Sequence, residues 1–408
     1  MTRRFDLVLF GATGFTGRLV AEHLWRTQAS SGLCWALAGR QRDKLEQVRH
    51  AIGASEALPL VTADAADVAA MESLARQTRA VLTTVGPYQR HGTVLVSACA
   101  ASGTDYVDLC GEPLWMAQMI GRLQTPAEAS GARIVFSCGF DSIPFDLGVV
   151  FLQQAMIDRY GLPAQEVRAR VKVLKGSLSG GTAASALATF EQVARHPEQA
   201  ALLADPFALT ATTPGFRGPQ QPDDDGAAYD AWARAWTGPF VMATINSKNV
   251  HRTHALRGWP WGQDFRYSER QLTGAGRSGE LRAHGLARQT RLQNLLLGFG
   301  PTRKLIGRFA LPQPGEGPGA GAREAGRFEV HLTGETAAGQ RLTAQVTGDR
   351  DPGYGSTSQM VSESALCLLQ DVGRGATPGG VWTAGSAMGL ALVRRLQAHT
   401  GLDFKLMG

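Results

Sequence analysis

The stretch FDLVLFGATGFTGRLV, residues 5–20, decides the fold of this chain. Its short apolar run is typical of a strand buried on both faces of a parallel sheet. Glycines follow at positions 11, 14 and 17 in the spacing G-x-x-G-x-x-G, and an amphipathic segment begins at Arg18. A buried strand, a glycine turn and a helix start together predict a dinucleotide-binding site. The competing interpretation is an ordinary strand-to-helix turn.

The glycines of this turn each have a physical role in a dinucleotide site. Gly11 permits a sharp turn, Gly14 lets the backbone approach a diphosphate without a Cβ in the way, and Gly17 lets the helix pack closely on the sheet. The helix start offers free N–H groups to phosphate, and threonine hydroxyls add donors. The predicted diphosphate-binding residues are Gly11, Ala12, Thr13, Gly14, Phe15, Thr16 and Gly17.

Strand-like and helix-like segments alternate after this start. Further buried strands are predicted at residues 34–39, 58–63, 80–85, 104–109 and 132–137. Such alternation is the pattern of a parallel sheet with right-handed crossovers. We therefore predict an α/β fold in which residues 1–148 form a doubly wound Rossmann sheet.

The ends of the predicted strands suggest which dinucleotide binds. A site for NAD usually has Asp or Glu at the end of the second strand, whereas Arg suits the 2′-phosphate of NADP. Here that position carries Arg40, with Lys44 nearby, so the sequence favours NADP. A solvated helix start at residues 43–46 is the alternative. Asp64 ends the third strand, where the adenine often lies.

The fourth predicted strand points to the nicotinamide side of the site. It ends in Val85, Gly86 and Pro87, which let the chain pass close to the nicotinamide, and Tyr88 follows. In doubly wound folds the strand ends on this side form the cofactor crevice.

The remainder of the chain predicts two more regions. Residues 149–355 are expected to form a second α/β domain with a mixed sheet, for substrate binding or dimerisation. It would contain a strand at 166–176, a glycine turn opening a helix at 177–185, a surface loop at 213–225, a strand or buried connection at 239–250 and a hairpin over 327–348. Residues 356–408 are expected to be C-terminal helices: one starts at an S-x-x-Q capping box on Ser356, and one covers 386–398.

Composition excludes several classes of protein. The net charge is +6, but residues 251–310 alone carry a net +8, which predicts one basic face and an anionic partner. No nucleic-acid motif accompanies it. The five cysteines show no C-x-x-C pattern and are expected to be buried thiols in a reducing, cytoplasmic setting, with no metal site. No run of 18 apolar residues is present, so no helix is expected to span a membrane.

Motifs spread in order over nearly the whole chain resemble the saccharopine-dehydrogenase-like oxidoreductases, and most closely their trans-acting enoyl reductase branch. They are GATGFTG (11–17), AGR (38–40), GPY (86–88), GTDYVDLCGE (103–112), GFDSIPFDLG (139–148), SGGTAAS (179–185), PGEGP (314–318), GYGSTSQM (353–360) and GGVWTAGSAMG (379–389). The resemblance implies an NADP-binding Rossmann domain, a second α/β domain that covers the nicotinamide, and C-terminal helices packed back on the first domain.

Three functions compete at this point. The first is NADPH-dependent reduction of an activated C=C bond in an acyl thioester or lipid, which needs an acid near the nicotinamide. The candidates are Tyr88, Asp141 and Tyr354. Their structural alternatives are stacking on the cofactor, capping the helix near Ile143, and a turn aromatic between two glycines.

The second function is oxidation of an amine or reduction of an imine, as in saccharopine enzymes. Its carboxylate substrates would need arginine clamps, which residues 251–310 could supply. The third is a cofactor-bound scaffold at a membrane surface. For any of them, the basic segment offers a peripheral contact with anionic lipid, and a homodimer is a further expectation.

Overall fold

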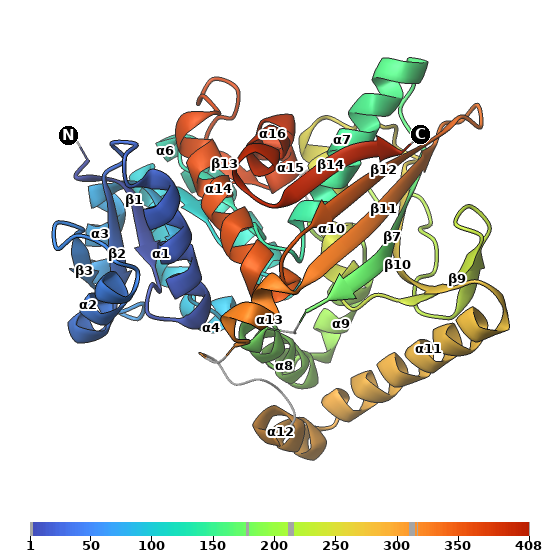
Figure 1. Cartoon of the computed structure of the whole chain (residues 1–408), viewed down its shortest axis with the longest axis horizontal. Coiled ribbons are helices and arrows are strands. Elements are labelled where there is room, and N and C mark those ends of the chain that lie inside the picture. Colours follow the sequence, from blue (N-terminus) through green and yellow to red (C-terminus); the bar gives the residue numbers. More distant parts are fainter. Residues whose placement is uncertain (1–2, 177–178, 211–215, 310–314, 316, 408) are drawn as a thin grey trace.

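Two seven-stranded sheets organise the molecule in the computed structural model, which describes residues 3–176, 179–210, 216–309, 315 and 317–407 (Figure 1). One sheet is wholly parallel and the other is mixed. This confirms the α/β class, with a Rossmann-type sheet followed by a second, mixed sheet. The domain boundaries at residues 148 and 355 stay predictions.

The first sheet has the strand order of a doubly wound fold, extended by one strand from the far end of the chain. In spatial order it contains β3 (Leu60–Thr62), β2 (Trp35–Gly39), β1 (Phe5–Phe10), β4 (Thr78–Thr83), β5 (Asp105–Val107), β6 (Arg133–Val135) and β13 (Gly380–Trp382). Its connecting helices are α1 (Phe15–Gln28), α2 (Arg42–Ala51), α3 (Val68–Gln77), α4 (Tyr88–His91), α5 (Thr93–Ser102) and α6 (Pro113–Ser130). Because helices cover both faces, the inner strands β2, β1, β4, β5 and β6 are almost wholly buried, whereas the edge strand β3 is half-buried to exposed.

The second sheet runs in the order β14 (Leu402–Met407), β12 (Arg341–Gly348), β11 (Arg327–Glu335), β7 (Glu166–Lys175), β10 (Arg266–Gly274), β9 (Ala235–Pro239) and β8 (Ala228–Asp230). Only the pair of β7 and β10 is parallel among its described pairings. Side chains in β11 and β12 alternate between buried and half-buried, as expected of a sheet with one face on the core.

Helices of the later chain connect and flank the two sheets. They are α7 (Ile143–Tyr160), α8 (Gly180–Arg195), the 3₁₀ turn η1 (Pro197–Gln199), α9 (Ala200–Ala204), α10 (Ala243–Leu256), α11 (Gly276–Gly298), α12 (Gly300–Phe309), α13 (Ala320–Glu324), the π-turn η2 (Pro352–Ser356), α14 (Thr357–Gln370), α15 (Ala384–Ala387) and α16 (Gly389–His399). Figure 1 shows α14 between the two sheets and α11 with α12 at the outer edge of the molecule.

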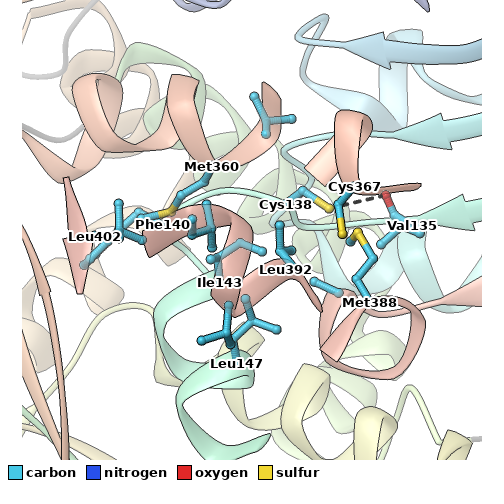
Figure 2. Close-up of a cluster of buried hydrophobic side chains, with 14 of the residues drawn as sticks. Val135, Cys138, Phe140, Ile143, Leu147, Met360, Cys367, Met388, Leu392 and Leu402 are labelled. Atoms are coloured by element: carbon cyan, nitrogen blue, oxygen red, sulfur yellow. Dashed lines mark hydrogen bonds between the residues drawn. The ribbon is translucent and has the colours of Figure 1, made fainter. Parts of the chain in front are cut away.

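The two sheets share one apolar core. Helix α7 leaves β6 and packs on β11 and β12, while α14 packs on α1 and beside β4 and β5. Figure 2 shows where these elements meet: Val135, Cys138, Phe140, Ile143, Leu147, Met360, Cys367, Met388, Leu392 and Leu402 lie in one buried cluster. The cluster joins the Rossmann sheet to the second sheet through apolar burial, the dominant stabilising contribution in folding.

A buried ionic contact strengthens the same junction. Glu363 of α14 accepts hydrogen bonds from His23 of α1 at 2.7 Å and from Arg395 of α16 at 2.6 Å. Arg395 also donates to Asp371 at 2.8 Å. Helix α1 and the two helices α14 and α16, which lie more than three hundred residues later, are therefore held together around one carboxylate.

Three local predictions are wrong. Residues 239–250 are mostly helical, with residues 243–250 in α10. The sequence did not indicate this helix because its buried face carries polar side chains and therefore lacks the apolar period by which a helix is identified. Ser356 forms no capping box: it continues the π-turn in αR geometry, and its hydroxyl donates to Arg350 O. The predicted helix over 386–398 is broken between α15 and α16, where Gly389 has φ +47°.

One prediction about cysteines also needs correction. Cys34 is exposed, because it lies just before β2 at the end of the sheet, whereas Cys99, Cys110, Cys138 and Cys367 are buried. No described helix is both long and apolar enough to cross a membrane.

Candidate active site

A large cavity lies where the carboxyl ends of the Rossmann strands face the second half of the chain. Its volume is about 1730 Å³. The first half contributes the glycine turn after β1 and the loops after β2, β3 and β4, and the second half contributes α8, α10, α11 and α12. A pocket at the carboxyl ends of parallel strands is where doubly wound folds bind their ligands.

The glycine turn has the geometry that its spacing predicts. Gly11 has φ +92°, and a Cβ there would lie 2.6 Å from Val85 Cγ2. A Cβ on Gly17 would lie 2.1 Å from Gly11 O, so only glycine lets α1 pack this closely. A Cβ on Gly14 would meet only Gly11 O, at 3.4 Å, so a larger side chain at this position would extend into the cavity. The turn therefore fits a diphosphate, with Gly14 as the point of closest approach.

The first turn of α1 faces the same space. Its N-cap is Gly14, and no side chain among the described residues caps it. Thr13, Phe15 and Thr16 line the cavity, whereas Ala12 is fully buried behind the wall. The free N–H groups and dipole of this helix end suit a phosphate group.

Two cations mark the far end of this part of the cavity. Arg40 follows β2 and Lys44 lies in the first turn of α2, and both line the cavity and are exposed. Asp64 lies beside them, where its carboxylate accepts from Ala66 N at 2.9 Å. The wall thus offers positive charge where the 2′-phosphate of NADP would lie, and we retain Arg40, Lys44 and Asp64 as predicted cofactor contacts.

The loop after β4 forms the next stretch of wall. Val85 and Gly86 line the cavity, and a cis peptide bond joins Gly86 to Pro87, which precedes α4 and lies outside the wall. Tyr88 also lines the cavity, but its hydroxyl donates to Thr83 O at 3.3 Å and accepts from Leu109 N at 3.1 Å. Two backbone partners hold this hydroxyl, so the geometry favours a structural role for Tyr88.

Of the three predicted proton donors, Asp141 is the carboxylic acid that lines the cavity. It follows β6, just before Ser142, the N-cap of α7, and it lines the cavity. Its side chain does not cap α7. Burial raises the pKa of its carboxyl to about 6. A carboxyl whose pKa lies near neutrality beside a cofactor cleft is a candidate for proton transfer.

Tyr354 lies across from the glycine turn. Its hydroxyl accepts from Gly180 N at 2.9 Å, and its ring packs edge-on against Phe15 with 4.7 Å between ring centroids. Burial raises its pKa. Tyr354 thus holds the start of α8 beside the glycine turn, and it lines the cavity.

Sequence reasoning missed Glu112, which organises the wall around Tyr88. Its buried carboxylate accepts from Tyr88 N and Gln89 N, both at 2.8 Å, and from Ser185 Oγ at 2.6 Å. The signal was present, since Glu112 ends the motif GTDYVDLCGE and Ser185 ends SGGTAAS.

The second half supplies two kinds of wall. The apolar part comes from Leu187 and Phe190 of α8, Leu296 and Leu297 of α11, and Ile306 of α12. The polar part includes Asp223, Asp224 and Asp225, so the predicted surface loop over 213–225 partly encloses the cavity instead; residues 213–215 lie outside the described part. Burial raises the pKa of Asp224 to about 6.

Comparison with known proteins identifies the family. A Mycobacterium tuberculosis protein provisionally named as a trans-acting enoyl reductase is 39% identical over 97% of this chain and 96% of its own length. A trans-acting enoyl reductase of Mycobacterium bovis is 37% identical over the same shares. This chain belongs to the trans-acting enoyl reductase family. The resemblance carried by the motifs is confirmed.

Two further comparisons place the family. Residues 7–135 match the model of the saccharopine dehydrogenase NADP binding domain, so this enoyl reductase family member is an NADP-binding oxidoreductase. The structure of saccharopine dehydrogenase (L-Glu forming) from Saccharomyces cerevisiae aligns with a TM-score of 0.55 at 13% identity, covering 99% of this chain and 100% of that chain. That likeness shows a shared fold.

Proposed function

We propose that this family member reduces the C=C bond of an α,β-unsaturated acyl thioester. When bound, NADPH supplies the hydride that adds to Cβ and is oxidised to NADP⁺. A proton then adds to Cα, so the π bond is replaced by two C–H bonds. The observation that carries the proposal is one continuous cavity whose wall runs from the cofactor turn to the apolar side chains of α8, α11 and α12.

The residues of the cavity divide this work. The turn after β1 and the start of α1 bind the diphosphate, and Arg40 and Lys44 attract the 2′-phosphate. Asp141 holds a proton at its carboxyl up to a pH of about 6 and donates it toward Cα. The hydroxyl of Tyr354, positioned by Gly180 N, is the second candidate donor. The apolar wall excludes water from the reacting carbons.

A single-turnover experiment tests this function. The NADPH-loaded protein is mixed with a panel of 2-enoyl thioesters and cyclic imines, and the loss of NADPH absorbance is followed. We expect oxidation with the enoyl thioesters. Oxidation with the imines alone would establish the amine-type reaction instead, and tight NADPH binding without any oxidation would favour the scaffold.

The amine-type alternative has one supporting observation and one against it. Asp223, Asp224 and Asp225 line the cavity and could pair with an ammonium group. The expected arginine clamps are missing, however: within the described chain, no arginine of residues 251–310 lines the cavity. Such a substrate carries two carboxylates and would lack the arginine pair that the sequence led us to expect, with Lys248 as the cation that this half contributes to the lining, so we favour the enoyl thioester.

We further propose that α11 and α12 bring the protein to an anionic lipid surface. Their outer side exposes Leu292, Leu295, Phe299 and Leu305, with exposed fractions of 56% to 72%. Exposed basic side chains accompany them, among them Arg288, Arg291 and Lys304. Apolar residues beside cations are the pattern of an interfacial helix. The homodimer stays a prediction.

A further inference from the structure

Helix α10 presents a polar stripe to the cavity. Thr244, Ser247 and Lys248 have the spacing i, i+3 and i+4, which places them on one face of a helix, and all three line the cavity. The facing wall beside Lys248 comes from Leu203 and Pro206, in and after α9. The stripe lies in the predicted connection over 239–250, for which the sequence suggested no function.

Lys248 is the unusual member of this stripe because its ammonium group is buried. Only 2% of the residue surface is exposed, and Nζ donates one hydrogen bond, to Leu203 O at 2.7 Å. In the described part of the chain Lys248 forms no ion pair. Burial lowers the pKa of its ammonium group to about 8, and the negative charge of Asp205 offsets only part of this lowering. An ammonium group has three N–H donors, and Leu203 takes one.

A buried cation without a counter-ion lowers stability. The position of Lys248 in a cavity wall therefore points to a ligand that supplies the missing negative charge and hydrogen-bond acceptors. The charge also differs in position from Arg40 and Lys44, which lie on the Rossmann side of the cavity. Lys248 therefore lies in the part of the wall that the second half of the chain provides, whereas the proposed contacts of the cofactor phosphates, the glycine turn with α1 and the pair Arg40 and Lys44, all belong to the first half.

Building on the proposed function, we infer that Lys248 binds an anionic oxygen of the acyl thioester, with the hydroxyls of Thr244 and Ser247 beside it. Two oxygens share the required chemistry. One is the thioester carbonyl oxygen, which gains negative charge as hydride reaches Cβ. The other is a phosphate oxygen on the pantetheine arm of the thioester. A compact ammonium with two spare donors suits either of them.

The apolar part of the cavity wall suggests one orientation for the substrate. Leu187, Leu296 and Ile306 form an apolar end between α8, α11 and α12, where a hydrocarbon chain would be buried. Helix α12 packs directly on α8 beside this end, since a Cβ on Gly307 of α12 would lie 2.9 Å from Leu187. An acyl chain at the apolar end and a charged oxygen at Lys248 satisfy both walls, whereas the reverse orientation would bury the charge among leucines.

The competing structural role of Lys248 is to cap the carboxyl end of α9 through Leu203 O. A cap and a substrate contact differ in what they affect. Loss of a cap lowers thermal stability alone, while loss of a substrate contact changes kinetic constants in a way that depends on which thioester is offered.

The test compares Lys248→Met, which keeps much of the apolar stem, with Lys248→Arg, which keeps the charge. Lys405→Met, an exposed lysine on β14 that does not line the cavity, is the matched control. Each variant is assayed with the same 2-enoyl group on N-acetylcysteamine, which has no phosphate, and on coenzyme A. NADPH affinity and melting temperature are measured in parallel, and coenzyme A binding to each protein is measured by calorimetry.

We expect Lys248→Met to lower kcat/KM by about 10- to 100-fold, the range for losing a charge-assisted hydrogen bond, with NADPH affinity unchanged and partial recovery in Lys248→Arg. A fall in kcat with both thioesters assigns the contact to the carbonyl oxygen. A rise in KM with the coenzyme A thioester alone, together with weaker coenzyme A binding, assigns it to phosphate.

Wild-type kinetics and coenzyme A binding in a folded Lys248→Met protein would overturn the inference. If Lys248→Met does not fold, the same comparison is made with Lys248→Arg and Lys248→Gln. If the wild type turns over no thioester, the proposed function fails separately, and calorimetry of both coenzyme A and a non-reactive saturated acyl thioester with wild type and Lys248→Met still decides whether Lys248 binds the ligand.

Discussion

Ser185 donates a hydrogen bond to the carboxylate of Glu112 across 2.6 Å, and this contact joins α8 in the second half of the chain to the residue that precedes α6 in the first. The same carboxylate accepts the backbone N–H groups that begin α4. One buried side chain therefore sets both the loop after β4 and the position of the cavity wall facing it.

Removal of the Glu112 carboxylate should lower the free energy of unfolding more than removal of the Ser185 hydroxyl. Glu112→Ala leaves the N–H groups of Tyr88 and Gln89 without their acceptor, and we expect a loss of about 2–4 kcal/mol in the free energy of unfolding. Ser185→Ala keeps both and should cost about 1 kcal/mol. Urea unfolding measures both values. Equal losses would show that the link between the two halves matters as much as the loop.

The glycine turn predicts two different failures. Gly14→Val should abolish NADPH binding in a folded protein, because the branched side chain fills the place of the diphosphate. Gly17→Ala should instead destabilise the fold by about 1–3 kcal/mol, since its Cβ would lie 2.1 Å from Gly11 O. Fluorescence titration with NADPH and thermal melting separate the two. Retained NADPH affinity in Gly14→Val would show that the turn is only structural.

Arg40 should set the choice between NADP(H) and NAD(H). Arg40→Asp removes the cation beside the 2′-phosphate and supplies an acceptor for a ribose hydroxyl, so the ratio of affinities should shift toward NAD(H) by about 1–3 kcal/mol. Arg42→Asp is the control, because Arg42 does not line the cavity and pairs with Glu46 at 3.1 Å. Similar shifts in both variants would contradict a specific role for Arg40.

Asp141 predicts a pH dependence of turnover. Burial raises its pKa to about 6, so the protonated donor is present below that pH and is lost above it. If Asp141 supplies the proton, kcat should fall as pH rises through about 6, and Asp141→Asn should have a low kcat without this limb. NADPH affinity serves as the control. If kcat of Asp141→Asn still falls as pH rises through about 6, another group supplies the proton, and Tyr354 is the next candidate.

The same pKa shift has a consequence for stability. Because the folded-state pKa lies above the unfolded value, the contribution of Asp141 to stability is complete below about pH 4 and is lost as pH rises through about 6. Asp141→Asn should therefore be more stable than the wild type at pH 8, relative to pH 4. Melting temperatures at both pH values measure this. A difference of the opposite sign would show that the carboxylate is stabilised by a partner.

The basic outer side of α11 and α12 should bind anionic vesicles. Reversal of Arg288, Arg291 and Lys304 to Glu should weaken co-sedimentation with phosphatidylserine vesicles, and wild-type binding should fall steeply with salt, since exposed charges are screened within about 10 Å at 0.1 M. NADPH affinity should stay unchanged. If the triple variant sediments with the vesicles as the wild type does, this side is only a solvent-exposed surface without a role in lipid binding.

The sequence was sufficient for the parts whose chemistry is local. The position of the glycine turn and that of Arg40 in the cavity wall could be predicted, because a turn and a strand end depend on a few neighbouring residues; their contacts with the cofactor stay predictions. Lys248 could not be predicted, because its role arises from Leu203, a partner that only the fold brings close. The motifs pointed to Glu112 and Ser185 separately, but only the fold shows that the two side chains meet. Helix α10 was missed for a related reason: its buried face is polar, and an apolar period is the main signal for a helix.

Strand β13 has a consequence for synthesis of the chain. It pairs with β6 through residues 380–382, more than two hundred residues after β6 has left the ribosome. Until then β6 is an open edge with unpaired backbone groups, the feature that invites pairing with another nascent chain. The Rossmann sheet thus becomes complete only after residues 380–382 have been made, and a version shortened before residue 380 would keep this edge open for its whole lifetime.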